Sequence, residues 1–471
     1  MSTWTYGEAL AWLRSLPDFE RTGEFSERPD VEPVLALLAA LGDPHRARPT
    51  VHLAGSKGKG STGAMVESLL RAAGLRTGYY ISPHLHRWRE RIRLGGEPAT
   101  EEAFASALAS VRDALPGVAE RFPGRHFIAF DALTMAAFVA FRDASADAQV
   151  VEVGLGGRLD STNVFHEAAH VAHVAVITPI SLEHTDILGT TIPQIAREKA
   201  GIITPGCTVV VSPQRESALD VIRAVAAERG AAVVEVAASC QVSRTSASAG
   251  EQKFKLKTPR GTYDVTLPLA GRHQLENAAA AVVACEAFAG RAGMELTPVH
   301  VREGLGRVRW PARLEVLQRR PLVVIDGAHN GDSAKRMAAA LRDDFGLASA
   351  TFVFGSLAGK DVGGMAAAVA PVAAAVYATG WPSERAADPR ELAAAFAGLD
   401  VPVFTFGDPV QAYEAAVAAA GESGAVVAFG ALSFVALVRA YVLGIESDMI
   451  RMMSRAPREA ARGEGPARAT E

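Results

Sequence analysis

The sequence predicts an α/β protein with at least two cores, each built on a mainly parallel sheet. Its 471 residues amount to about three domain lengths. Hydrophobic residues make up 49% of the chain and charged residues 21%, which is typical of a globular protein. Apolar runs of strand length alternate with helical patterns in two series, before and after Trp310-Pro311. Such alternation is typical of parallel sheets covered by helices.

The first series opens with a strand, a Gly-rich turn and a helix. The apolar stretch TVHLAG begins at Thr50, SKGKGS follows it, and Met65 and Leu69 then lie on one helical face. Gly74 is placed to end that helix, and a second apolar run spans 77–82. This order predicts a βαβ unit with a right-handed crossover and parallel strands.

Further elements of the first series are expected downstream. We predict a helix over 131–141 and strands over 149–153, 171–178 and 208–212. Between residues 253 and 267, apolar and polar residues alternate around Pro259-Arg260-Gly261. This pattern predicts a hairpin at the edge of the same sheet.

The second series follows Pro311 and repeats the alternation. It comprises a strand over 322–325, a helix after Asn330, a strand over 351–354 and strands near Tyr377, Phe404 and Val427. The uncharged stretch 425–438 is too short to cross a bilayer and is better interpreted as a strand followed by a helix. We therefore expect domains over 1–308 and 309–445 and a flexible tail over 446–471.

Charge and cysteine content exclude several classes of protein. The net charge is −4 and no long cationic run is present, so we expect neither nucleic acid nor a membrane as partner. The three cysteines are too few and too scattered for a disulfide framework or a metal knuckle. Residues 1–29 lack the apolar segment of an export signal. We expect a cytoplasmic monomer.

The segment 55–61, Gly-Ser-Lys-Gly-Lys-Gly-Ser, is the strongest candidate for a ligand site. It lies between a strand and a helix, where backbone N–H groups and the helix dipole favour an anion. Lys59 can neutralise phosphate oxygens and Ser61 can donate a hydrogen bond. The match to the common P-loop is imperfect, because the first spacer is short and Gly60 separates the lysine from the hydroxyl. A Gly-rich turn without phosphate is the alternative.

Polar residues follow three further strands of the same series. Glu152 ends one strand, Ser82 ends another, and His184 comes shortly after a third. The carboxyl ends of parallel strands meet at one edge, where ligands bind, so these residues predict a Mg²⁺ site beside the phosphate loop. The alternatives are a salt bridge for Glu152 and a hydrogen-bonded loop position for His184.

Two other motifs have both a functional and a structural interpretation. Lys199 lies on a short helix that Pro193 opens and Gly201 ends, where a solvated charged turn is the simpler interpretation. The segment 326–330, Asp-Gly-Ala-His-Asn, follows the first strand of the second series and opens a helix. A helix cap is the simpler interpretation there.

Together and in this order, the motifs resemble those of the folate branch of the Mur ligase superfamily, the folylpolyglutamate and dihydrofolate synthases. The resemblance runs from about residue 13 to 443. The motifs are GSKGKGS (55–61), SPHLHRWRERIRL (82–94), FDALTMAAF (130–138), EVGLGGRLDSTN (152–163), SLEHTDILG (181–189), REKAGI (197–202), RWPARLE (309–315) and DGAHN (326–330).

The resemblance implies a three-layer P-loop-type ATPase domain, a C-terminal Rossmann-like domain and an active site between them. It implies that ATP is held by Ser56, Lys57, Gly58, Lys59, Gly60, Ser61, Asn277, Arg313 and Asp326. It further implies two Mg²⁺ ions, one on Ser82 and Glu152, the other on His184 and a carbamylated Lys199. Lys59, Lys199 and His329 would be the catalytic residues, and Phe130, Leu159, Asp160 and Ser161 would line the substrate pocket.

The implied reaction joins L-glutamate to dihydropteroate or to reduced folates through an acyl phosphate. Two departures from the family pattern bear on it. Ser56-Lys57 stands where the family has Thr-Asn, and the segment 18–29, where the family holds the pterin, follows no alignable pattern. The alternatives are folylpolyglutamate synthase activity alone, a cell-wall Mur ligase acting on a UDP-linked acceptor, or a nucleotide-binding protein without catalysis.

Overall fold

The computed structural model describes residues 4–18, 30–46, 48–165 and 173–448. Nearly all of the segment 18–29 and residues 449–471 of the expected tail therefore lie outside the described residues. The first three tail positions are described, and Ser447 and Asp448 are buried. No described helix combines the length and apolarity that crossing a membrane would need.

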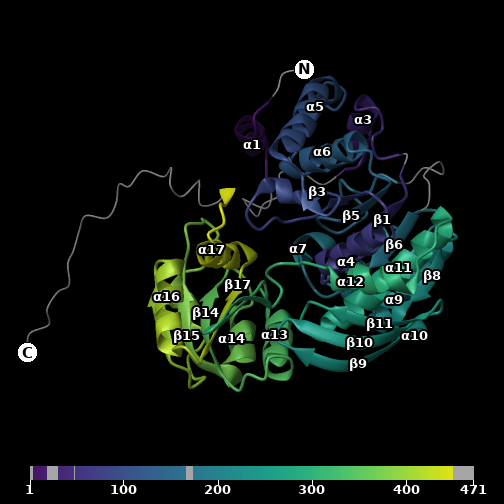
Figure 1. Ribbon diagram of the computed structural model, residues 1–471. Coiled ribbons are helices and arrows are strands. Elements are labelled where there is room, and N and C mark those ends of the chain that lie inside the picture. The colour runs from purple at the N-terminus through teal and green to yellow at the C-terminus, as the bar shows by residue number, and fades with distance from the viewer. Residues whose placement is uncertain (1–3, 19–29, 47, 166–172, 449–471) are drawn as a thin grey trace, which may run out of the picture.

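The first series forms an eight-stranded sheet (Figure 1), in which six neighbouring strands, reaching one edge, are parallel and the two short strands at the other edge pair antiparallel. In spatial order the strands are β4 (Glu97–Pro98), β3 (Ile92–Leu94), β2 (Thr77–Tyr80), β5 (Ala148–Glu152), β1 (Thr50–Ala54), β6 (His173–Ile177), β7 (Thr208–Val211) and β8 (Ala232–Glu235). The expected βαβ unit forms, but β5 lies between β1 and β2. Consequently the carboxyl ends of β2, β5, β1 and β6 lie next to one another at one edge.

Helices cover both faces of this sheet. One face carries α1 (Tyr6–Ser15), α3 (Glu32–Ala40), α5 (Glu101–Ala119) and α6 (Ala129–Asp143), with α7 (Thr185–Leu188), α8 (Ile192–Ala200) and α9 (Glu216–Glu228) beside them. The other face carries α4 (Lys59–Ala72), α11 (His273–Ala292) and α12 (Pro298–Gly306). The helix predicted over 131–141 is thus confirmed as α6.

The hairpin predicted over 253–267 forms, but its predicted place at the edge of the parallel sheet is wrong. Strands β10 (Glu251–Lys257) and β11 (Thr262–Leu267) join β9 (Gln241–Ser248) in a separate antiparallel sheet. Every second side chain of β10 is buried, because the apolar face of the hairpin packs on α11 and α12. The short helix α10 (Val236–Ser239) leads into this layer.

The second series forms a six-stranded sheet with helices on both faces, as expected for a Rossmann-like unit. Its order is β12 (Glu315–Arg319), β13 (Leu322–Asp326), β17 (Ala425–Gly430), β14 (Ala350–Gly355), β15 (Ala373–Thr379) and β16 (Val403–Phe406), with only β12 antiparallel. Helices α13 (Gly331–Asp343), α14 (Val362–Val369) and α15 (Pro389–Ala394) cover one face, and α16 (Pro409–Ala420) and α17 (Leu432–Leu443) the other.

Phe354 on β14 and Phe429 on β17 stack inside the second core, with ring centroids 4.7 Å apart. Both side chains are fully buried. We expect Phe354→Ala to lower the free energy of unfolding by about 3–5 kcal/mol, since it removes buried contacts and leaves a cavity. Phe404→Ala on the edge strand β16 is the control, because Phe404 is 48% exposed. Chemical denaturation of both variants measures the difference, and similar small losses would contradict this account of the core.

Candidate active site

The phosphate-loop candidate connects β1 to α4 and needs glycine at two positions. Gly55 has φ +148°, and a Cβ there would lie 1.9 Å from Oγ1 of Thr178. Gly58 has φ +87°, and its Cβ would lie 2.6 Å from Oδ1 of Asn277. A side chain at either position is excluded by backbone conformation and by space. The loop therefore packs closely against β6 on one side and α11 on the other.

The two lysines expected to be catalytic converge on one carbonyl oxygen. Lys59, from the first turn of α4, and Lys199, from α8, each donate from Nζ to the Gly55 oxygen at 3.0 Å. Lys199 is buried and also pairs with Glu183 at 2.7 Å. Burial lowers the pKa of Lys199 to about 8, although Glu183 opposes the shift. Lys199 is therefore not part of a solvated turn.

Glu152 and Ser82 meet at the same edge of the sheet. The backbone N–H of Ser82 hydrogen-bonds to the Glu152 carboxylate, which is itself buried. Burial raises the pKa of Glu152 to about 7, while the nearby cations Lys59 and Arg313 oppose the rise. A buried carboxylate beside a hydroxyl-bearing residue supplies hard oxygen atoms, the donors that Mg²⁺ prefers.

His184 lies at the start of α7, in the left-handed conformation with φ +46°. Burial lowers its pKa; the neighbouring Glu183 opposes this shift, and Lys360 adds to it. His184 and Lys199 thus share Glu183 as a neighbour. The structure brings these two predicted metal ligands into one cluster, together with Glu183.

The donor atoms decide which of the two expected Mg²⁺ sites fits the unmodified chain. Among described residues, no group of three or more His, Cys, Asp and Glu side chains is arranged to hold a metal. Ser82 and Glu152 provide oxygen atoms that fit one ion. The other site fits only if Lys199 is carbamylated, because an ammonium group has no lone pair to donate. Unmodified Lys199 instead contacts Glu183 and the Gly55 oxygen.

The start of the loop is tied to neighbouring segments. The backbone N–H groups of Ser56 and Lys57 both donate to the oxygen of Pro179, at 3.0 and 3.2 Å. The Lys57 side chain points to the other unit and pairs with Asp332 of α13. In this conformation, therefore, the loop's first N–H groups are satisfied by the protein itself.

The end of the loop lies against α11 and a tryptophan. Gln274 bridges Ser61 and Asn277: its amide donates to Oγ of Ser61 at 3.4 Å and its oxygen accepts from Asn277 at 2.9 Å. A Cβ at Gly60 would lie 2.7 Å from the ring of Trp310. Asn277 therefore lies next to the loop residues, as the resemblance implies.

The segment 326–330 brings the second sheet to the site. Asp326 ends β13 and accepts two backbone hydrogen bonds, and burial raises its pKa despite nearby Arg313. Arg313 packs on Gly327, where a Cβ would lie 2.4 Å from its Nη1. His329 is exposed. Asn330 caps α13 by accepting from a backbone N–H at 2.9 Å, so the helix-cap interpretation holds for this residue.

The residues expected around the pterin form a compact group. Phe130, on α6, lies against Gly154, and Leu159 is partly exposed. Asp160 is buried, and its oxygen atoms accept three hydrogen bonds from its own loop, at 2.5–3.0 Å. Ser161 donates to Asp131 at 2.5 Å. In this structure, Asp160 and Ser161 shape the loop.

Sequence reasoning missed four residues of the site: Glu183, Asp332, Lys360 and Trp310. Glu183 and Trp310 lie within the motifs SLEHTDILG and RWPARLE, so their neighbours could have indicated them. Asp332 directly follows the DGAHN motif. Lys360 carries no local signal, and only the fold brings it near His184.

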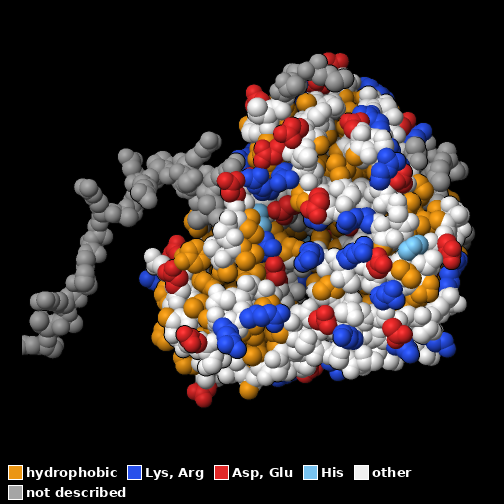
Figure 2. All heavy atoms as spheres, in the orientation of Figure 1, with side chains coloured by type: hydrophobic (Ala, Val, Ile, Leu, Met, Phe, Trp, Pro, Cys, Tyr) orange, Lys and Arg blue, Asp and Glu red, His pale blue; other side chains and the backbone are white. Residues whose placement is uncertain are grey.

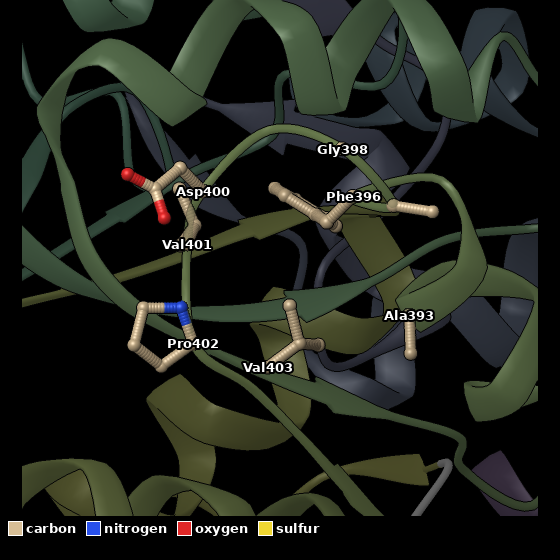
Figure 3. A pocket seen from close by; sticks show the side chains of 8 residues that line it. Ala393, Phe396, Gly398, Asp400, Val401, Pro402 and Val403 are labelled. Carbon is tan, nitrogen blue, oxygen red and sulfur yellow. The ribbon is translucent and has the colours of Figure 1, made fainter.

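Two pockets formed by described residues lie away from this site. A cavity of about 450 Å³ lies between α15 and β16 (Figure 3) and is lined by Ala393, Phe396, Ala397, Gly398, Asp400, Val401, Pro402 and Val403. Asp400 supplies its only ionisable side chain, so it offers little for catalysis.

Figure 2 shows acidic and basic side chains along the seam between the two units, where the candidate site lies.

Comparisons with known proteins agree with this arrangement. The Mur ligase middle domain matches residues 125–285, and the Mur ligase glutamate ligase domain matches 312–432. The chain is 35% identical to folylpolyglutamate synthase of Lacticaseibacillus casei, over 79% of this chain and 84% of that protein. It is 38% identical to dihydrofolate synthase/folylpolyglutamate synthase of Mycobacterium tuberculosis, over 78% and 77%.

A solved structure extends the similarity to almost the whole fold. Folylpolyglutamate synthase of Mycobacterium tuberculosis, complexed with ADP and AMPPCP, matches with a TM-score of 0.84 and 34% identity. The match covers 94% of this chain and all of that one.

Proposed function

The chain belongs to the Mur ligase family, in the branch of folylpolyglutamate and dihydrofolate synthases, and we propose that it joins L-glutamate to dihydropteroate and to reduced folates at the expense of ATP. The observation that carries this proposal is the convergence of Lys59 and Lys199 on the Gly55 oxygen, beside the buried Glu152. Cations and a metal-binding carboxylate at a Gly-rich strand–helix turn suit phosphoryl transfer.

The chemistry explains why ATP is required. A carboxylate resists attack because it is negatively charged and has no good leaving group. Its oxygen therefore attacks the γ-phosphorus, the bond to ADP breaks, and an acyl phosphate forms. The glutamate amine then attacks the carbonyl carbon, phosphate leaves with the C–O electrons, and the amine gives up a proton. The products are an amide, ADP and phosphate.

The protein's contribution is positioning and charge. Ser56, Lys57, Gly58, Gly60 and Ser61 contact the phosphates, and Lys59 neutralises charge on the transferring group. The backbone N–H groups of Ser56 and Lys57 donate to Pro179, so these two residues contact the phosphates through their side chains. Asn277, Arg313 and Asp326 hold the nucleotide from α11 and the second unit. His329 lies on the exposed turn next to Asp326, where it contacts the reacting groups.

Ser82 and Glu152 would hold one Mg²⁺, and His184 and carbamylated Lys199 a second. When bound, such ions offset the negative charge of the phosphates. Glu183 holds unmodified Lys199 in place. Burial lowers the pKa of Lys199 to about 8, so a large share of its amine is neutral at mildly alkaline pH and can react with carbon dioxide.

For the acceptor, we propose that Phe130 and Leu159 contact the pterin end, and that Asp160 and Ser161 fix the shape of the loop around it. The monomeric state and cytoplasmic location stay predictions from the sequence.

Acceptor range is the first test of this proposal. With ATP and glutamate, we expect phosphate release with dihydropteroate and with tetrahydrofolate, since both end in a carboxylate that reaches the same γ-phosphate. Turnover with tetrahydrofolate alone would reduce the function to folylpolyglutamate synthase. Phosphate release with a UDP-linked peptide acceptor, and with neither folate acceptor, would favour a cell-wall ligase. Nucleotide binding without any turnover would favour a non-catalytic protein.

Lys59→Ala should lower kcat by at least about a hundredfold, since it removes the loop's own cation from the pair that meets at the Gly55 oxygen. Lys253→Ala is the control, because Lys253 is 57% exposed on the antiparallel sheet. Circular dichroism and thermal unfolding should show both variants folded. A Lys59→Ala enzyme with the parental rate and ATP affinity would refute the loop assignment.

Lys199 should carry a carbamate whose occupancy rises as pH increases through about 8, because only the neutral amine attacks carbon dioxide. Carbon-13 NMR of protein in labelled bicarbonate should show a carbamate signal that Lys199→Ala lacks and Lys255→Ala retains. Lys199→Ala should also lose turnover, with partial rescue by small carboxylic acids. A fully active enzyme without the signal would contradict the modification.

A further inference from the structure

Lys57 connects the phosphate loop to the second unit. Its Nζ pairs with Oδ2 of Asp332, which lies 275 residues away in the first turn of α13. Lys57 is 20% exposed and Asp332 58% exposed, so the pair lies at the surface of the seam. The hydrogen bond from Lys57 holds the pKa of Asp332 below its usual range. A nucleotide-binding segment and the helix that follows the DGAHN motif are thus tied by one ion pair.

The direction of the Lys57 side chain differs from that of the other loop lysine. Lys59 and Lys199 turn inward to the Gly55 oxygen, whereas Lys57 turns across the seam to a carboxylate. The position of Lys57 in the Gly-rich turn is nevertheless next to the expected phosphates. A polyphosphate carries several negative charges and attracts an ammonium group more strongly than one exposed carboxylate does.

Asp332 can lose Lys57 at little cost. Arg336, one turn along α13, lies 3.7 Å from the same carboxylate. The N-terminal turn of a helix also favours a negative side chain. Exposed ion pairs contribute little to stability, so this one can exchange partners readily.

Resting on the proposed function, we infer that Lys57 changes partner during nucleotide binding, from Asp332 to the phosphates, and that Asp332 thereby competes with the nucleotide. The Lys57–Asp332 pair then belongs to the nucleotide-free form. Its release frees α13, and with it the turn that carries His329, from the phosphate loop. Nucleotide affinity and the contact between the two units are therefore coupled, and each affects the other to the same extent.

The test is a double-mutant cycle read by ADP binding in calorimetry, without folate or glutamate. Asp332→Asn should bind ADP about threefold more tightly than the parent at low salt, because the competing charge is gone. The gain should shrink as salt is raised. Asp343→Asn, at the other end of α13, is the matched control and should leave ADP affinity unchanged.

The cycle is completed by repeating Asp332→Asn in the Lys57→Gln background. If Lys57 exchanges Asp332 for the phosphates, Asp332→Asn should not increase ADP affinity in this background. An equal gain in both backgrounds would show a general field effect and overturn the inference, as would unchanged or weaker binding in Asp332→Asn alone. The proposed function fails separately: a parent that binds ADP and shows the predicted cycle, but releases no phosphate with either folate acceptor, leaves this inference standing. A parent that does not bind ADP overturns both.

Discussion

The carbonyl of Gly55 is the point on which the candidate site depends. It accepts hydrogen bonds from Lys59 and Lys199, which come from different helices, and so fixes two cations at the end of β1. The backbone can follow this path only because residue 55 has no side chain, since Thr178 on the neighbouring chain segment occupies the space where a Cβ would lie. The close contact between β1 and β6 therefore determines where positive charge gathers, and the loop conformation follows from it.

The two lysines concentrate positive charge at the end of β1, and acidic side chains surround them. Burial opposes the charged form of every group here, which is why the pKa of Glu152 rises to about 7 and that of Lys199 falls to about 8. Glu183 and Glu152 offset the lysines, but neither pair removes the cost of burying charge. Phosphate oxygens and metal ions would restore the balance, so the site is better suited to hold ligands than to stand alone.

The sequence was most informative where structure is local. The turn at 55–61, Glu152 at the end of its strand and the helix around Lys199 could be predicted because strand, turn and helix signals lie within a few residues. The position of the 253–267 hairpin could not be predicted. Alternating apolar residues indicate that the hairpin has one apolar face, but they do not indicate that α11 covers that face. Asp332 and Lys360 were missed for a related reason: each reaches the site only through the packing of the second unit on the first.

In the proposed function, the loop after β5 connects the acceptor site to the same sheet edge. Glu152 ends that strand, and eight residues later Asp160 uses its carboxylate to hold the loop in shape, while Ser161 is fastened to Asp131 on α6. A group whose oxygen atoms are already engaged recognises a pterin weakly by direct contact, since a new hydrogen bond must replace an existing one. In the proposed function, Phe130 and Leu159 would therefore contribute to selectivity by direct contact, and a change at Asp160 would act on acceptor binding through the path of the loop and, through its strand, through the position of Glu152.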